Sequence, residues 1–368
     1  MALNLFGKIG KNLSEMQLSK NEYKHYSRHL LLDEIGESGQ HLLKKSKVLV
    51  IGAGGLGCPT LLYLTAAGVG EIGIVDNDKV EVSNLQRQIL YTVEDIGKSK
   101  SHCAAMRLKK LNPHIKITGH NEFLNKNNAL SLFKNYDIIV DGSDNFATRY
   151  LTNDAAVITD RPFVYGAIHK FEGQVSVFNY LNGPTYRCLY QSPPQEHIPN
   201  CSEIGVLGVL PGIIGAFQAN EVIKIICGLE EVLSGTLLIF QAKTYQTNKL
   251  KILKNERINI SSLQESYSIN CDSQQSYQEL TWQEYKKNKT EYLLLDVRSA
   301  QEYFLANRGG LHIPIDELPQ KLKEIPAGKN LLVCCQSGAR SKKAIRILQE
   351  NKMGNKLFNL KGGLAAYQ

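Results

Sequence analysis

The sequence lacks several features that would assign the chain to a membrane or secreted class. No stretch approaches the apolar length of a membrane span, so we expect no transmembrane segment. The first eight residues lack the long apolar core and small-residue cleavage site of a signal peptide. The eight cysteines are scattered rather than framed as a disulfide scaffold, which favours a reducing, cytoplasmic compartment.

A concentrated charge of one sign is also missing. The formal net charge is +8 over 368 residues, and it is spread along the chain rather than gathered into a basic stripe. We therefore expect no nucleic-acid partner, whereas an anionic substrate or an acidic protein partner is compatible with this charge. Hydrophobic residues make up 43% and charged residues 21%, the balance of a soluble globular protein whose length indicates two domains.

What the sequence does contain is a glycine-rich turn between an apolar strand and a helix. Residues 48–51 form an apolar run typical of a strand buried on both faces, and residues 56–67 follow as a packed helix. Gly52, Gly54 and Gly57 between them fit the spacing G-x-G-x-x-G. Such a turn lets the backbone approach a phosphate and places a helix N-terminus behind it.

An acidic residue follows this turn at the distance typical of nucleotide-binding folds. A second strand over 72–75 ends in Asp76, about twenty residues beyond the glycines, where a carboxylate can take ribose hydroxyls. With the strand, the helix and the acid in place, the pattern predicts nucleotide binding. A tight strand–helix turn that binds no ligand is the alternative.

Helices and strands alternate through the first half of the chain. After a glycine-rich turn at Gly36 and Gly39, the pattern continues with helices over 99–111 and 128–134 and strands over 115–118 and 137–141. This alternation predicts an α/β fold, a doubly wound, Rossmann-like parallel sheet. Beyond Pro162, short strands rich in Val, Phe and Tyr indicate an antiparallel extension of that sheet.

The composition divides the chain into four segments. We expect a flexible N-terminus over 1–20, a first domain over 21–255, a polar and serine-rich linker over 256–275, and a small α/β domain over 276–368.

Two sets of polar residues in the first domain suit the binding of a triphosphate. Arg87, in the run Ser83-Asn-Leu-Gln-Arg-Gln, and Lys100, at the start of the next helix, could bracket the phosphates and stabilise a leaving pyrophosphate. Asp144 and Asn145 follow the strand over 137–141, where Asp144 would hold Mg²⁺ and Asn145 a polar group. Exposed surface charges and an Asx-rich turn are the alternatives.

The ordered set of these motifs resembles the bacterial relatives of the ubiquitin-activating enzymes, the HesA/MoeB/ThiF family of sulfur-carrier adenylyltransferases. The resemblance covers about residues 20–255 and includes Gly97-Lys-Ser-Lys100 and Glu172-Gly-Gln174. It implies a homodimer in which Arg28 reaches into the partner's site. It also implies that ATP is bound by Gly55, Asp76, Ser83, Asn84, Leu85, Gln86, Arg87, Lys100, Asp144 and Asn145.

The implied reaction is attack of a carrier's C-terminal glycine carboxylate on the α-phosphorus of ATP, which gives an acyl adenylate and pyrophosphate. Positioning and charge stabilisation carry such a displacement. Little acid–base chemistry is needed, in agreement with the lack of an obvious His–carboxylate pair in the motifs.

The cysteines depart from the family pattern. The family often holds zinc with two Cys-x-x-Cys pairs, but here Thr185 replaces the first cysteine of the pair ending in Cys188, and Cys271 stands alone in the linker. Because a structural zinc site needs four ligands, we expect no zinc. Cys201 falls where related enzymes carry a cysteine that attacks the adenylate, so we expect a catalytic or sulfur-relay role; a spare thiol is the alternative.

The tail over about 275–368 resembles the rhodanese family. The resemblance rests on Leu294-Leu-Asp-Val-Arg298, on Glu302 and on Cys335-Gln-Ser-Gly-Ala-Arg-Ser341. A strand over 330–334 carries Cys335 into a loop before a helix, whose N–H groups would favour the thiolate and stabilise a persulfide anion. Arg340 would strengthen this field, and Cys334 reads as a small buried hydrophobe.

Together the two halves predict an enzyme that adenylates a ubiquitin-like sulfur carrier ending in Gly-Gly and then transfers sulfur from a Cys335 persulfide to form a thiocarboxylate. A cysteine desulfurase is the expected persulfide donor. Molybdopterin synthesis is the first choice of pathway and thiamine synthesis the second. Two other functions stay open: a dinucleotide-dependent oxidoreductase fused to a sulfurtransferase, and a non-catalytic scaffold that binds a carrier.

Overall fold

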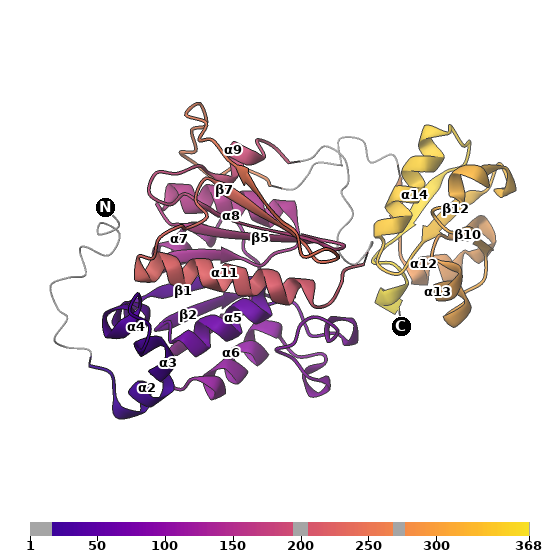
Figure 1. The fold of residues 1–368 in the computed structure, drawn as a ribbon. Coiled ribbons are helices and arrows are strands. Elements are labelled where there is room, and N and C mark those ends of the chain that lie inside the picture. The colour runs from indigo at the N-terminus through magenta and orange to yellow at the C-terminus, as the bar shows by residue number, and fades with distance from the viewer. Residues whose placement is uncertain (1–16, 194–204, 268–276, 368) are drawn as a thin grey trace. The chain divides into compact units, whose positions relative to one another are not determined.

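The computed structural model describes residues 17–193, 205–267 and 277–367. It divides into two units, Met1–Ile269 and Asn270–Gln368 (Figure 1), each with its own sheet.

The first unit is built on an eight-stranded sheet in the order β3-β2-β1-β4-β5-β6-β7-β8. Neighbours from β3 to β5 pair in parallel, whereas β5 to β8 pair antiparallel. The doubly wound parallel sheet with an antiparallel extension is therefore confirmed. The strands are β1 (Lys47–Ile51), β2 (Glu71–Val75), β3 (Lys116–His120), β4 (Ile138–Asp141), β5 (Phe163–His169), β6 (Glu172–Phe178), β7 (Thr236–Gln241) and β8 (Thr247–Lys251).

Helices cover both faces of this sheet (Figure 1). Local sequence sets their ends: Ser99 and Asn145 accept hydrogen bonds at the starts of α6 and α8, and left-handed Gly68 and Gly228 end α5 and α11. The helices are α2 (Lys20–His25), α3 (Ser27–Leu30), α4 (Gly36–Lys45), α5 (Gly57–Ala67), α6 (Lys100–Leu111), α7 (Ala129–Lys134), α8 (Phe146–Ile158), α9 (Tyr186–Leu189) and α11 (Leu210–Cys227).

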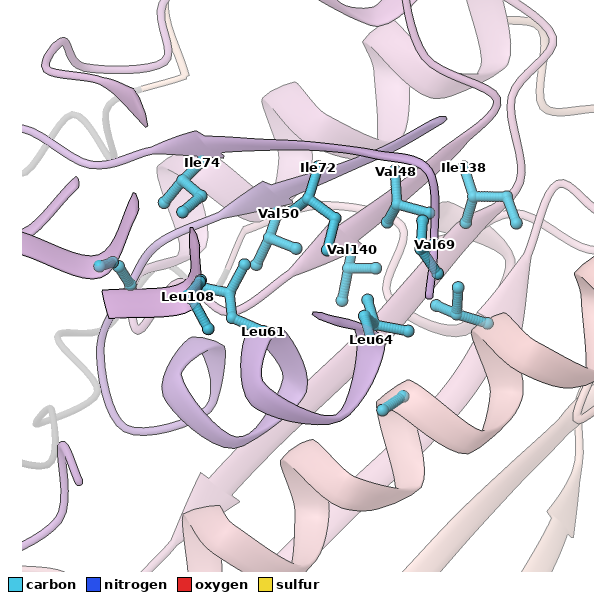
Figure 2. Close-up of a cluster of buried hydrophobic side chains, with 14 of the residues drawn as sticks. Val48, Val50, Leu61, Leu64, Val69, Ile72, Ile74, Leu108, Ile138 and Val140 are labelled. Atoms are coloured by element: carbon cyan, nitrogen blue, oxygen red, sulfur yellow. The ribbon is translucent and has the colours of Figure 1, made fainter. Parts of the chain in front are cut away.

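Alternate residues of the central strands fill two hydrophobic clusters. Figure 2 shows Val48 and Val50 of β1 with Ile72 and Ile74 of β2, pointing toward α5. In register, Val48 lies opposite Ile72 and Ile138 on the neighbouring strands, so each layer of side chains faces the same side. Leu49 points the other way, into the cluster that includes residues of α7 and α8. Burial on both faces explains the unbroken apolar runs.

Helix α11 is long and apolar enough to cross a membrane by length and composition. It has 18 residues and a mean hydropathy of 1.3, so the expectation that no stretch approaches such a length is wrong on these two measures. Its sequence is 56% buried inside the unit, and its residues lie close to α5, β5 and β6. Thr60 of α5 donates a hydrogen bond to the Gly215 carbonyl at 3.0 Å, as expected for a core helix.

The second unit contains a five-stranded parallel sheet in the order β11-β10-β12-β13-β9. Helix α14 packs in one hydrophobic cluster and α12 in another, so both faces of the sheet are covered. The small α/β domain is confirmed. Its elements are β9 (Gln278–Leu280), α12 (Trp282–Lys287), β10 (Tyr292–Asp296), α13 (Ala300–Leu305), β11 (Leu311–His312), β12 (Asn330–Cys334), α14 (Ala339–Glu350) and β13 (Leu357–Leu360).

Two boundary segments differ from the predictions. Part of the expected linker belongs to the first unit, because Tyr267 is buried and donates a hydrogen bond to Asp154 at 2.8 Å. At the other end, the expected flexible N-terminus overlaps ordered structure. Leu18 is buried and Ser19 forms a capping box with Glu22 at the start of α2.

Candidate active sites

The glycine loop joins β1 to α5 and lies against the loop after β4. A Cβ on Gly57 would lie 1.9 Å from the Gly52 carbonyl oxygen, so Gly57 is required by the packing of the loop on itself. Gly52 has a φ of 88°, in the left-handed region, and a Cβ there would crowd the Gly142 carbonyl. Gly54 is different, because a Cβ would meet only the Gln88 Nε2, at 3.8 Å.

Asp76 anchors the glycine loop from the end of β2. Its carboxylate accepts hydrogen bonds from the backbone N–H groups of Ala53 and Asp78, each at 2.8 Å. Burial raises the pKa of Asp76, although these two donors oppose that change. A carboxylate oxygen can accept more than one hydrogen bond, so Asp76 can still receive hydroxyl donors from a ligand.

Lys100 enters the site from the first turn of α6 and is held by an acid. Its Nζ lies 2.9 Å from Asp78 Oδ2, and its own side chain is 7% exposed whereas that of Asp78 is 60% exposed. Asp78 was missed by the sequence predictions. Arg87 is half-buried and donates to the Ser83 carbonyl at 3.0 Å.

Asp144 and Asn145 follow β4. Asn145 Oδ1 accepts the Thr148 N–H at 2.9 Å and so caps α8, the Asx role considered as the alternative. Asp144 is exposed. Both residues nevertheless line the same cavity as the glycine loop.

A cavity of about 700 Å³ brings these groups together. It lies at the carboxyl ends of β1, β2 and β4, where the strand order reverses, the usual ligand position in such sheets. The predicted residues among its lining are Gly52, Gly54, Gly55, Asp76, Arg87, Lys100, Asp144 and Asn145.

Other predicted residues do not line this cavity. Asn84 is buried and accepts the Glu81 N–H at 3.0 Å, so it shapes the turn that carries Arg87. Arg28 is exposed on α3, and Cys201 lies outside the described residues. Four more predicted residues are absent from the cavity lining: Gly57, Ser83, Leu85 and Gln86.

The part of the cavity wall around Arg149 was not predicted. Arg149 is buried there, with its guanidinium 5.5 Å from the Phe146 ring centre and 5.6 Å from that of Tyr165. Its Nε lies 3.8 Å from Asp141 Oδ2, and neither atom has a hydrogen-bond partner within the described ranges. Burial raises the pKa of Asp141 to about 6, with Arg149 opposing the change. Arg149 lies four residues after Asn145, in the first turns of α8. Predicting α8 from the sequence would therefore have placed Arg149 close to Asn145.

The second unit surrounds a cysteine sulfur with donors. Cys335 Sγ accepts the N–H groups of Gly338 at 3.1 Å and Ser341 at 3.4 Å, and lies 3.6 Å from the Ser341 hydroxyl. These groups come from the loop and first turn after β12, as predicted. Cys334 is buried, and burial raises its pKa, as expected for a small hydrophobic residue.

The expectation that Arg340 strengthens the positive field at Cys335 needs correction. The guanidinium donates to both carboxylate oxygens of Glu302, each at 2.6 Å. Glu302 therefore offsets most of the charge that Arg340 brings to the loop.

Cys188 sits in a polar corner rather than in a visible metal site. Its Sγ accepts the N–H groups of Thr185 at 3.3 Å and Asn255 at 3.4 Å. Beside it, the Arg187 Nε lies 2.7 Å from Asp154. In the described part of the chain no group of three or more His, Cys, Asp or Glu residues could hold a metal ion. Cys271 lies outside that part, so the absence of zinc stays a prediction.

Comparison with known proteins agrees with both halves. The model of the ThiF family matches residues 26–261, and that of the rhodanese-like domain matches residues 279–368. The chain belongs to the ThiF family. It therefore combines a ThiF-family unit with a rhodanese-like unit, as predicted.

Similar proteins carry related names. The chain is 41% identical to a "Probable molybdopterin-synthase adenylyltransferase" of Porphyra purpurea, over 95% of this chain and 94% of that protein. It is 38% identical to a "Probable adenylyltransferase/sulfurtransferase MoeZ" of Mycobacterium tuberculosis, over the same shares of the two chains. A solved structure of E. coli MccB with ATP shares the fold, with a TM-score of 0.55 and 19% identity over 68% of this chain and 83% of that one.

Proposed function

We propose that this ThiF-family protein adenylates the C-terminal glycine of a ubiquitin-like sulfur carrier and then transfers sulfur from a Cys335 persulfide to give a thiocarboxylate. One observation carries the proposal: a single cavity collects the glycine loop, Asp76, Lys100 and Asp144 in a chain whose second unit surrounds Cys335 with N–H donors. The printed names of the relatives, adenylyltransferase and sulfurtransferase, support both steps.

In the first step, the chain's own residues bind ATP and stabilise charge. The glycine loop and the N-terminus of α5 hold phosphate oxygens, and Asp76 takes the ribose hydroxyls. A carrier carboxylate oxygen forms a bond to the α-phosphorus while the bond to the β-phosphate oxygen breaks, and its electron pair leaves with pyrophosphate. Lys100 and Arg87 stabilise that leaving charge. A dinucleotide cofactor of an oxidoreductase has no leaving pyrophosphate, so Lys100 and Arg87 would have no such charge to stabilise.

Mg²⁺ fits the cavity as a companion of the nucleotide. Asp144 offers exposed carboxylate oxygens on the cavity wall, the donor type that Mg²⁺ prefers. The described residues provide no three-ligand cage, which suits an ion that keeps several waters and binds mainly to phosphates. Bound there, the ion would neutralise phosphate charge, with Asp144 as its protein ligand.

In the second step, the outer sulfur of the Cys335 persulfide attacks the acyl carbon and AMP leaves with the electron pair of the broken bond. The carrier is then joined to Cys335 through a disulfide. Attack of the Cys201 thiolate on the Cys335 sulfur would release the thiocarboxylate and leave a Cys201–Cys335 disulfide for an external thiol to reduce. A thiolate next to backbone N–H groups, as at Cys335, suits persulfide chemistry.

The wider setting belongs to the same proposal. We infer a homodimer in which the exposed Arg28 completes the partner's site, and a cysteine desulfurase as persulfide donor. The cytoplasm fits the six cysteines within the described ranges, all of which are free thiols. Molybdopterin synthesis is the preferred pathway, supported by the Porphyra relative's printed name, and the thiamine-pathway carrier is the alternative.

Pyrophosphate exchange into ATP tests the first step. Each Gly-Gly-ended sulfur carrier of the source organism is supplied separately, with wild-type protein and with Asp144→Ala. Exchange with one carrier, lost in the variant, is expected and identifies the pathway. Cys335→Ser is the matched control, because it should exchange normally and yet form no thiocarboxylate. Absence of exchange with every carrier would sink the proposal.

A further inference from the structure

The loop around Cys335 carries one formally charged side chain. Between Cys335 and Ser341 the sequence holds Gln336, Ser337, Gly338 and Ala339 as well as Arg340, so only Arg340 brings a full charge. The groups that touch the Cys335 sulfur are two backbone N–H groups and one hydroxyl. These are neutral dipoles that act at short range, so the long-range attraction of this loop for a free anion depends mainly on Arg340.

Glu302 pairs with the guanidinium of Arg340 through both of its carboxylate oxygens. Two parallel hydrogen bonds of 2.6 Å join the guanidinium to both oxygens of the carboxylate, the strongest geometry for such a pair. The Ser299 N–H and hydroxyl donate to Glu302 at 3.0 and 2.9 Å and fix it from behind. The hydrogen bonds from Arg340 hold the pKa of Glu302 at about 2, so the carboxylate is ionised throughout the neutral range.

The pair also lies where a solute can reach it. The Arg340 side chain is 29% exposed and that of Glu302 is 35% exposed, whereas Cys335 is fully buried. A solute can therefore contact this charge-balanced pair from the solvent.

Two classes of sulfur donor differ in their negative charge, and therefore in how strongly a free Arg340 would attract them. In both, the Cys335 thiolate bonds to the donor's outer sulfur while the donor's S–S or S–SO₃ bond breaks. A cysteine persulfide releases a thiol after protonation, whereas thiosulfate enters with two negative charges and releases sulfite. Thiosulfate, with two negative charges, therefore gains more from a free cation than a persulfide, whose sulfurs carry at most one.

We propose that Glu302 determines donor specificity: by neutralising Arg340 it disfavours sulfur oxyanions and leaves persulfides on cysteine thiols as the preferred donors. The inference rests on the proposed sulfurtransferase function of this unit. It names a residue and a donor class for that site.

Glu302→Gln tests this directly. The amide oxygen can still accept from Ser299, while Arg340 loses its counter-charge. We expect kcat/KM with thiosulfate and cyanide to rise at least tenfold, mainly through a lower KM, and to fall again with added salt. With cysteamine persulfide as donor, whose ammonium balances its persulfide anion, transfer to Cys335 should change less than threefold. The rise should disappear in the double variant Glu302→Gln/Arg340→Gln.

Glu317→Gln is the matched control. It removes one carboxylate from the same unit and breaks an exposed pair with Lys321 of 2.8 Å, so it should leave both donors unaffected. Unchanged thiosulfate kinetics in Glu302→Gln would overturn the specificity proposal, as would an equal rise with both donors, which would indicate a loosened loop. If the wild type accepts sulfur from neither donor, the proposed sulfurtransferase function falls as well.

Discussion

Gly54→Ala separates a glycine required by a ligand from a glycine required by the fold. A Cβ on Gly54 meets nothing closer than the Gln88 Nε2 at 3.8 Å, which is ordinary contact, and its φ lies outside the left-handed region. The matched variant is Gly57→Ala, whose Cβ would lie 1.9 Å from the Gly52 carbonyl oxygen. Both positions belong to the same loop, but only Gly54 lines the cavity.

The expected stabilities follow from this geometry. At a position with compatible φ and free space, glycine to alanine stabilises a protein by about 0.4–1 kcal/mol, because the unfolded chain loses freedom. Gly54→Ala should therefore unfold at or slightly above the wild-type temperature. Gly57→Ala forces backbone apart and should lose roughly 1–3 kcal/mol or more of unfolding free energy.

Gly54→Ala should weaken ATP binding although it leaves the fold intact. The added methyl of Gly54→Ala stands where phosphate oxygens would approach the loop, and each lost hydrogen bond to a charged group is worth about 1.5–3 kcal/mol. Since about 1.4 kcal/mol is tenfold in affinity, one lost bond predicts a 10- to 100-fold weaker complex.

Thermal unfolding with and without ATP measures both effects. At an ATP concentration of about 100 times Kd, the wild type should gain about 2.7 kcal/mol, whereas a variant binding 100-fold more weakly gains about 0.4 kcal/mol. If Gly54→Ala is stabilised by ATP as strongly as the wild type, phosphates do not contact this loop and the reasoning is refuted. Unfolding at a lower temperature without ATP would instead show that Gly54 serves the fold.

Three further predictions follow. Tyr91 donates from its hydroxyl to the Ala53 carbonyl at 2.8 Å, so Tyr91→Phe should loosen the glycine loop and raise the KM for ATP in the exchange assay about tenfold, with kcat less affected. Tyr267→Phe removes a hydrogen bond from buried Asp154 and should lower the unfolding free energy by about 1–3 kcal/mol in denaturant titrations, an effect that a true linker residue would not show. Because burial raises the folded pKa of Asp141 from 3.8 to about 6, the unfolded state releases the proton first and stability should fall as pH rises between these values. Asp141→Asn should flatten that fall in pH-dependent melting.

The residues that sequence alone placed correctly share a physical reason. Gly52, Asp76 and Asp144 follow strands buried on both faces, and such strands are unbroken apolar runs that are easy to locate. Once the strands are known, parallel pairing brings their carboxyl ends to one edge, so the residues after them must lie near one another. Spacing along the chain was enough to predict this half of the cavity.

Helices α4 and α8 were missed because their sequences conflict with simple patterns. Gly39 suggested a turn, but a Cβ there would lie 2.9 Å from Ile35 and 3.4 Å from the sulfur of Cys227, so glycine permits close packing within a helix. In α8 the buried positions include Arg149 and Asp154, which destroy the expected apolar stripe. Their partners lie on other elements, and no local pattern reveals those partners.

The same long-range pairing explains why the carboxylate partners of the predicted cations at both sites were not predicted. Lys100 is paired with Asp78, and Arg340 with Glu302, 38 residues away in sequence. A cation with a carboxylate at 2.9 Å or less is not free to attract a ligand from a distance, because the two fields largely cancel. A triphosphate entering the first unit must therefore displace the exposed Asp78 from Lys100.

The positive charge of Lys100 is therefore available only to a ligand that displaces Asp78. Asp78 is 60% exposed, so water can solvate its carboxylate at small cost once the pair opens. A polyphosphate is a stronger partner for Lys100 than a single carboxylate. A singly charged solute lacks that advantage and leaves the pair closed. In the second unit Glu302 is tied by Ser299 as well as by Arg340, so its pair should open less readily. The ThiF unit is thus suited to admit a polyanion, whereas the rhodanese-like unit is suited to exclude one.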